Sequence, residues 1–151
     1  MFTGWHHTNV IVSDLDRSLD FYTRVLGLKV ASQMEIDDPE FARGVGIPDT
    51  RVRAAFLEVP NSTTLLEMFE YATIISKPIS KDALPSDLGI QHICFRVDDI
   101  EAVYQNLVAQ DVVFLSPPVT LGTDKGDTDA VRFCYFRDPD GSLLELLQLP
   151  T

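Results

Sequence analysis

The stretch HTNVIVSDL at residues 7–15 returns later in the chain as HICFRVDDI at residues 92–100. In both copies the histidine is followed after five residues by valine, after seven by aspartate, and after eight by leucine or isoleucine. A second pair of matching segments, LLEMF at 65–69 and LLELL at 143–147, places one glutamate in each half. The chain is therefore built from two related halves, and each carries one histidine and one glutamate at a matching place.

Hydrophobic periodicity predicts the same order of elements in each half: strand, helix and three further strands. For the first half it predicts a helix that starts after Ser13 or Asp14 and ends at Gly27, a long loop at 37–48, and strands at about 5–13, 28–35, 51–59 and 64–70. For the second half it predicts a helix with Asp98 as its N-cap, a loop at 121–129, a turn at 138–141, and strands at about 89–97, 112–115, 130–137 and 142–148. The prediction is an α+β fold of two tandem βαβββ modules, at about 1–70 and 89–151, joined by a linker at about 71–88.

Strand alternation predicts where the histidines and glutamates point. His7 lies opposite the most apolar face of its strand, and so does His92 on the repeated strand. The apolar faces should pack under the helices, so both histidines should point away from them. The two glutamates stand among apolar residues, where a buried carboxylate without a partner costs several kcal/mol. A divalent cation would remove that cost, and the recurrence favours one metal site formed by His7, Glu67, His92 and Glu145.

Each of these residues has a simpler explanation when it is taken alone. A single strand histidine is usually a surface residue or a hydrogen-bonded one, and a single glutamate is often the polar member of an amphipathic strand. Arg96 shares a face with His92, where it either binds a substrate anion or pairs with a neighbouring acid. His6 is interpreted as a surface residue. The other candidate substrate-binding residues are Asn9, Phe69 and Tyr135; for the aromatic ones, and for Phe56, packing in the core is the alternative.

Composition limits the classes of partner. A chain of 151 residues with 45% hydrophobic and 23% charged residues fits one globular domain. A net charge of -11 argues against a nucleic-acid partner, which would need a basic surface. There is no apolar run of about 20 residues for a membrane span, and no signal peptide pattern at the N-terminus, so a cytoplasmic location is expected. Cys94 and Cys134 stand in strand-like apolar runs and are interpreted as small core residues.

Three motifs around the histidines and glutamates resemble those of the vicinal oxygen chelate superfamily, also called the glyoxalase and bleomycin-resistance fold. They are the first-module opening from His7 through SDLDRSLDFY (13–22) to VLGL (25–28), the second-module opening GIQHICFRVDDI (89–100), and the closing FRDPDGSLLEL (136–146). The resemblance covers nearly the whole chain. It implies one cup-shaped mixed sheet around a divalent ion, a homodimer whose modules pair within a chain or across subunits, and metal ligands at His7, Glu67, His92 and Glu145.

The resemblance also implies a class of reaction. Two imidazoles and two carboxylates without a thiolate suit Mn, Fe, Co, Ni or Zn. Such an ion would stabilise an enolate when a proton leaves the carbon beside a carbonyl, and Glu67 or Glu145 would act as the base. The expected function is that of a metal-dependent isomerase, epimerase or lyase of the glyoxalase type, acting on a small oxygenated substrate.

Departures from individual relatives narrow this expectation. Glyoxalase I of the bacterial type has an arginine and an asparagine for glutathione where this chain has Ile11 and Tyr71. Methylmalonyl-CoA epimerase usually has glutamine in place of Glu67, and its additional acidic base falls near Asp49. An isomerase or epimerase for another substrate is therefore favoured. Two other classes stay open: an Fe(II) extradiol ring-cleaving dioxygenase, which uses two His and one Glu, and a metal-free antibiotic-binding resistance protein.

Overall fold

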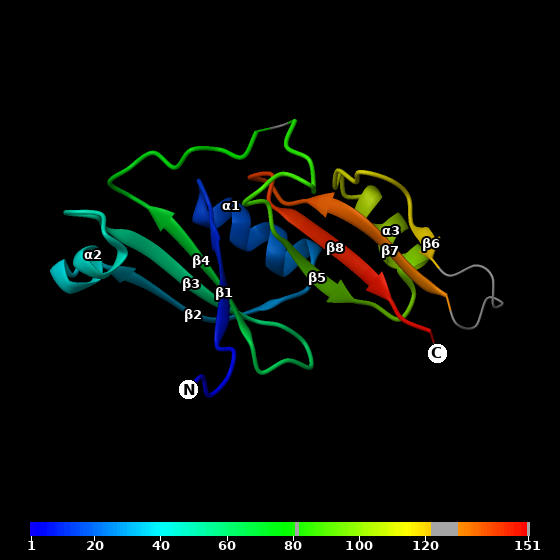
Figure 1. The fold of residues 1–151 in the computed structure, drawn as a ribbon, viewed down its shortest axis with the longest axis horizontal. Helices are drawn as coiled ribbons and strands as arrows, with labels where there is room; N and C mark the ends of the chain where they lie inside the picture. The colour runs from blue at the N-terminus through cyan, green and yellow to red at the C-terminus, as the bar shows by residue number, and fades with distance from the viewer. Residues whose placement is uncertain (81, 122–129, 151) are drawn as a thin grey trace. The chain divides into compact units, whose positions relative to one another are not determined.

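The computed structural model describes residues 1–80, 82–121 and 130–150, shown in Figure 1. These residues form two compact units, Met1–Pro78 and Ile79–Thr151, each with its own four-stranded mixed sheet. The division falls within the segment 71–88 that the sequence assigns to the linker. The predicted α+β class with tandem modules is confirmed.

The first unit has strand order β1-β4-β3-β2, with β1 parallel to β4 and the other pairs antiparallel. Asp14 is the N-cap of its first helix, because its carboxylate accepts a hydrogen bond from the Arg17 backbone N–H at 3.0 Å. Gly27 ends the helical region in the left-handed conformation, with φ of 79°. The elements are β1 (His7–Ile11), α1 (Leu15–Asp20), the π-helical segment η1 (Phe21–Val25), β2 (Lys29–Ile36), α2 (Pro39–Val45), β3 (Val52–Glu58) and β4 (Leu65–Tyr71).

The core of the first unit lies on the sheet face opposite His7. Helix α1 contacts β3 and β4. It contributes Leu15 and Leu19 to the buried set, and Tyr22 follows from η1. The strand residues facing the same way are buried too: Val10, Ala55, Leu57, Leu66 and Met68. The most apolar face of β1 therefore packs on the helix side, as alternation predicts.

Helix α2 corrects the prediction of a loop at 37–48. Asp38 caps this helix by accepting from the Glu40 backbone N–H at 2.7 Å, and Pro39 occupies the first turn. Gly46 ends it with φ of 73°. The Phe41 ring packs edge-on against the Phe69 ring at 5.8 Å, so α2 contacts the sheet face that carries Glu67.

The second unit repeats this topology with strand order β5-β8-β7-β6. Its core packs α3 against the sheet through Ile100 and Leu107, with Phe136, Leu144 and Leu146 buried on the strands. The turn at 138–141 forms as predicted, with the Asp138 carboxylate accepting from the backbone N–H groups of residues 140 and 142. The elements are β5 (His92–Arg96), α3 (Ile100–Val108), β6 (Val119–Leu121), β7 (Val131–Arg137) and β8 (Leu143–Gln148).

Three details of the second unit differ from the predictions. Asp99, and not Asp98, is the N-cap of α3, accepting from the Ala102 backbone N–H at 3.0 Å. The predicted strand at 112–115 is reduced to an isolated pairing of Phe114 with Phe136, and the edge strand of the sheet is β6. Of the loop predicted at 121–129, Leu121 ends β6 and the remainder lies outside the described residues.

Within the described ranges, no helix has both the length and the apolar composition needed to cross a bilayer. The longest helix, α3, has nine residues, whereas a span requires about 20.

Candidate metal centre

The parallel strand pairs bring histidine and glutamate together in each unit. In the first unit Asn9 pairs with Glu67 across β1 and β4, which places His7 two residues away on the same face. In the second unit Cys94 pairs with Glu145 across β5 and β8, with His92 again two residues away. The repeat in sequence is therefore also a repeat in register.

The side chains complete two matching pairs. His7 Nε2 lies 3.4 Å from Glu67 Oε2 in the first unit. His92 Nε2 lies 3.1 Å from Glu145 Oε2 in the second. The glutamate side chains are only 9% and 11% exposed, whereas the histidine side chains are 37% and 43% exposed. Each pair thus consists of a buried carboxylate covered by an imidazole at the surface.

This donor geometry fits a divalent metal ion. Ligand atoms about 2.1 Å from one ion lie about 3.0 Å apart at a right angle and about 3.4 Å apart at a tetrahedral angle. The two measured N–O separations, 3.4 and 3.1 Å, fall in this range. A cation would also offset the burial of the two carboxylates, which is otherwise unfavourable.

Each unit supplies two of the predicted ligands. Across the part of the chain that the structure describes, no group of three or more His, Cys, Asp or Glu side chains is arranged to hold an ion. A four-ligand centre would need both pairs, His7–Glu67 and His92–Glu145.

The two half-sites differ in the residue beside the carboxylate. In the first unit the Asn9 amide donates a hydrogen bond of 2.8 Å to Glu67 Oε2. In the second unit the corresponding residue is Cys94. Partial desolvation of this thiol, together with the charge of Glu145 and a hydrogen bond to it, raises the pKa of Cys94 to about 12. In the absence of a metal ion, the thiol therefore stays protonated at neutral pH.

We expect Asn9→Leu to weaken divalent metal binding by about 10- to 100-fold, because a partner that orients a ligating carboxylate usually contributes this much. Leucine keeps the size of the side chain and removes the donor. Thr8→Val is the matched control, since Thr8 is the adjacent residue on the opposite face of β1. Competition titration with a chelating dye measures both affinities. Equal affinities for the two variants would contradict this role of Asn9.

Aromatic rings flank both histidines. The Phe56 ring lies edge-on to the His7 ring at 5.9 Å, and the Tyr135 ring lies edge-on to the His92 ring at 5.2 Å. Both aromatic residues are the register partners of the glutamates on the neighbouring strand. Burial, the charge of Glu145 and the neighbouring Cys94 raise the pKa of the Tyr135 phenol, which therefore stays a hydrogen-bond donor at neutral pH.

Of the other predicted residues, Arg96 and Phe69 also lie on the glutamate-bearing faces. Arg96 ends β5 and lies two residues after Cys94, and Phe69 lies two residues after Glu67 on β4. The exposed His6 contacts His7, with 2.8 Å between their Nδ1 atoms. Residues Phe41 and Cys94 were not predicted as site residues. The signal for Cys94 was available in its position two residues after His92, matching that of Asn9 after His7.

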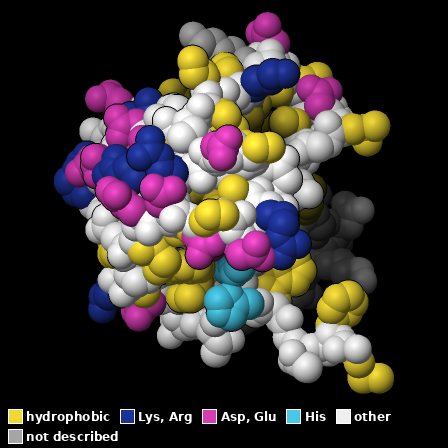
Figure 2. Space-filling view, turned by 90° about the vertical axis from the view of Figure 1, so that its left-hand side faces the viewer, with side chains coloured by type: hydrophobic (Ala, Val, Ile, Leu, Met, Phe, Trp, Pro, Cys, Tyr) yellow, Lys and Arg dark blue, Asp and Glu magenta, His cyan; other side chains and the backbone are white. Residues whose placement is uncertain are grey.

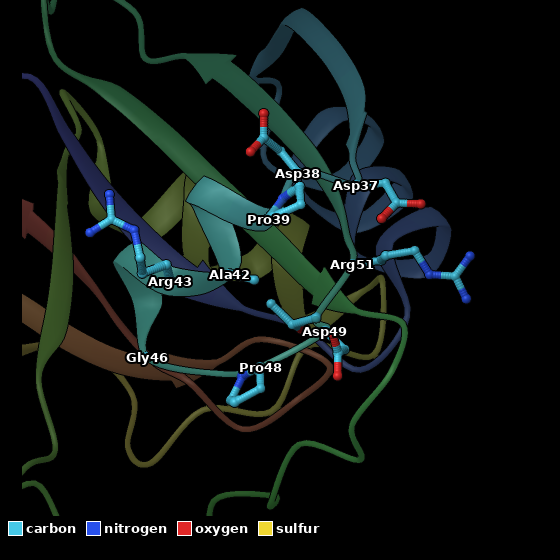
Figure 3. A pocket seen from close by; sticks show the side chains of 10 residues that line it. Asp37, Asp38, Pro39, Ala42, Arg43, Gly46, Pro48, Asp49 and Arg51 are labelled. Atoms are coloured by element: carbon cyan, nitrogen blue, oxygen red, sulfur yellow. The ribbon is translucent and has the colours of Figure 1, made fainter.

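A pocket of about 590 Å³ in the first unit lies between α2 and the segment leading to β3. It contains Asp49, the residue near the place of the additional acidic base implied by the resemblance. Its polar side chains do not converge: Figure 3 shows Arg43 and Arg51 extending to opposite sides, and Asp38 and Asp49 pointing in different directions. Neither His7 nor Glu67 lines this pocket. In the first unit, the candidate site is therefore the His7–Glu67 pair, where the two polar side chains point toward each other.

Several surface charges are paired with opposite charges. Figure 2 shows Lys and Arg side chains interspersed with Asp and Glu side chains, with histidines at the surface nearby. Ion pairs join Arg24 to Asp20 at 2.8 Å and Arg132 to Glu101 at 2.7 Å. Arg53 bridges Asp16 and Glu70 at 2.8 and 3.0 Å.

Comparison with known proteins identifies relatives of this chain. Residues 4–146 match the Glyoxalase/Bleomycin resistance protein/Dioxygenase superfamily. A 2-epi-5-epi-valiolone epimerase from Actinomyces sp. is 36% identical over 151 residues, which cover 96% of this chain and 79% of that protein. A lactoylglutathione lyase from Pseudomonas aeruginosa is 28% identical, over 95% of this chain and 81% of that protein.

Fold comparison finds the same architecture in a solved structure. A glyoxalase family protein from Bacillus cereus superimposes with a TM-score of 0.83 at 18% identity, over 100% of this chain and 97% of that one. At this identity the likeness concerns the fold alone. The family match over most of the length, together with the 36% identical relative, is what assigns the chain. The chain belongs to the Glyoxalase/Bleomycin resistance protein/Dioxygenase superfamily.

Proposed function

We propose that the protein is a divalent-metal-dependent epimerase or isomerase that moves a proton at a carbon next to a carbonyl group. The observation that carries this proposal is the pair of matched half-sites, in which His7 faces Glu67 and His92 faces Glu145 at 3.4 and 3.1 Å. The two pairs combine into one four-ligand site, either within a chain or across two chains of a homodimer. The substrate is a small oxygenated molecule.

The proposed metal is a Mn, Fe, Co, Ni or Zn ion held by His7, Glu67, His92 and Glu145. When bound, it would supply Lewis-acid stabilisation of negative charge on the carbonyl oxygen. The protein residues do the rest. The imidazoles of His7 and His92 act as neutral donors, and the carboxylates of Glu67 and Glu145 are the only groups of the half-sites suited to accept a proton from carbon.

One carboxylate from each half suits an inversion of configuration. An epimerase must remove a proton from one face of a carbon atom and return a proton to the other face. Glu67 and Glu145 come from different units and different strands, which gives the site two independent proton acceptors. The rings of Phe56 and Tyr135 each flank one histidine, where they would shield part of its half-site from water.

Two facts favour epimerisation over the lyase reaction. The 36% identical relative carries the name of an epimerase, whereas the lactoylglutathione lyase is 28% identical. The positions associated with glutathione binding in glyoxalase I are occupied here by Ile11, which is exposed and apolar, and by Tyr71. Neither side chain can form an ion pair with a glutathione carboxylate.

The test is proton exchange in heavy water. The metal-loaded protein is incubated with 2-epi-5-epi-valiolone and with 2-oxo, 2-hydroxy and acyl-CoA compounds, and deuterium is located by NMR and mass spectrometry. We expect deuterium at the carbon beside the carbonyl of the true substrate, together with inversion at that carbon. Protein treated with a chelator is the control and should incorporate none.

Other outcomes would identify other classes. Oxygen consumption with a catechol would replace the proposal with a ring-cleaving dioxygenase. Saturable drug binding that needs no metal and leads to no turnover would replace it with an antibiotic-binding protein. Formation of S-lactoylglutathione from methylglyoxal and glutathione would assign the lyase reaction.

A further inference from the structure

Arg96 lies on the same sheet face as the metal-binding pair of the second unit. Alternation along β5 puts Arg96 on the side of His92 and Cys94, and the strand register sets it opposite Leu147 on β8. Glu145 is two residues before Leu147 and faces Cys94. Arg96 is therefore offset from Glu145 by two residues, or about 7 Å, along the strand direction.

Arg96 has no partner within residues 1–80, 82–121 and 130–150. No ion pair, hydrogen bond or ring contact of its side chain occurs in this part of the chain. Arg96 is exposed, so its guanidinium group is accessible to a ligand. The chain has a surplus of acids, 23 against 12 Lys and Arg, yet none of the described acids pairs with Arg96. Arg24, Arg53 and Arg132 each pair with a carboxylate at 2.7–2.8 Å.

The neighbours of Arg96 across the sheet are apolar and cannot neutralise its charge. Leu147 is its register partner, and Phe133 is the register partner of Leu147 on β7. The Phe133 ring packs edge-on against Tyr135 at 5.7 Å, which connects this apolar surface to the ring that flanks His92. The guanidinium group of Arg96 can therefore form two parallel hydrogen bonds with a carboxylate or a phosphate-type group of a ligand.

We propose that Arg96 binds an anionic group, a carboxylate or a phosphate-type group, on the same substrate whose neighbouring oxygens are held at the His–Glu centre. The inference rests on the proposed function, because it assumes that a metal ion holds those oxygens. Residues 92 and 96 are about 13 Å apart along a strand. The anionic group is therefore separated from the metal-binding oxygens by several bonds. The substrate class is a small carbonyl or hydroxy compound with a negative charge at its far end.

The test uses three hydroxamates as probes, because a hydroxamate binds a metal ion through two adjacent oxygens. Succinic monohydroxamate ends in a carboxylate, 3-phosphonopropanoyl hydroxamate ends in a phosphonate, and the carboxamide of succinic monohydroxamate is the neutral equivalent. Binding is followed by the visible spectrum of the cobalt-loaded protein, which needs no substrate and no turnover. The readout is the ratio of the charged to the neutral dissociation constants.

In the wild-type protein we expect at least one charged probe to bind about 10- to 100-fold more tightly than the neutral probe, the range of a charge-assisted hydrogen bond. If the carboxylate probe has the larger gain in affinity over the neutral probe, the substrate carries a carboxylate. If the phosphonate probe has the larger gain, the substrate carries a phosphate-type group. In Arg96→Leu, the charged and neutral probes should have about equal dissociation constants, and the affinity for the neutral probe should be unchanged. Arg96→Lys should keep part of the preference. Arg51→Leu is the charge-matched control, since Arg51 also has no side-chain partner among the described residues but belongs to the first unit.

Two results would overturn the inference while leaving the metal centre in place. They are equal binding of charged and neutral probes to the wild-type protein, and a preference that survives in Arg96→Leu. A third result is distinguishable from these: if the neutral hydroxamate also fails to change the cobalt spectrum, both the metal centre and the role of Arg96 are wrong.

Discussion

His92→Ala is expected to reduce the affinity for a divalent metal by about 100-fold or more, beyond the range of partners that only orient a ligand. The substitution removes the imidazole whose Nε2 lies 3.1 Å from Glu145 Oε2. Glu145 is then the only ligand left in its half-site, and its largely buried carboxylate has lost the imidazole that covers it. Competition with a chelating dye measures the affinity directly.

His6→Ala is the matched control for this prediction. The described histidines are His6, His7 and His92, and His6 is the one outside both His–Glu pairs. His6 contacts His7 through Nδ1 and pairs with neither carboxylate of the two His–Glu pairs. We therefore expect only a small change in metal affinity. If His92→Ala and His6→Ala bind metal equally well, His92 is not a ligand.

Replacing either carboxylate by its amide is expected to have the largest effect on turnover. Glu67→Gln and Glu145→Gln should each slow epimerisation by about 10²- to 10⁴-fold, the usual contribution of a positioned general base. Glutamine keeps the size of the side chain and a weaker oxygen ligand, so both variants should retain more metal than His92→Ala. Epimerisation of the substrate identified by deuterium exchange is the assay.

Isotope exchange distinguishes the two carboxylates from each other. If each serves one face of the carbon atom, each variant should still exchange deuterium into one epimer while inversion is lost. Glu58→Gln is the control, because Glu58 is an exposed residue at the end of β3 outside the half-sites. Full turnover in Glu67→Gln would remove Glu67 from the chemistry and point to Glu145 or Asp49 as the base.

The topology and the faces of the strands were predictable because the duplication is visible in the sequence. A histidine and a glutamate that recur in both halves, each on a strand whose other face is apolar, leave few arrangements open. The structure adds the register that alternation alone cannot provide. The contact of Asn9 with Glu67, for example, joins strands 58 residues apart along the chain. Its existence depends on the parallel pairing of β1 with β4.

Two predicted segments were wrong because local sequence does not show tertiary packing: the loop at 37–48 and the edge strand at 112–115. Asp38, Pro39 and Gly46 suggested a loop, but here they are the N-cap, the first turn and the C-cap of α2. Buried Ala42 and the contact of Phe41 with Phe69 stabilise this short helix through tertiary packing, which local composition does not reveal. In the same way, pairing with β7 selected residues 119–121 as the edge strand in preference to 112–115.

The central claim is that two His–Glu pairs form one divalent metal centre. Its most direct test is elemental analysis of the protein purified without chelators and again after soaking with Mn, Fe, Co, Ni and Zn salts, in parallel with a His7→Ala/His92→Ala double variant. We expect about one equivalent of a transition metal per chain in the wild-type protein and close to none in the double variant. Less than a tenth of an equivalent in the wild type, not restored by soaking, would contradict it.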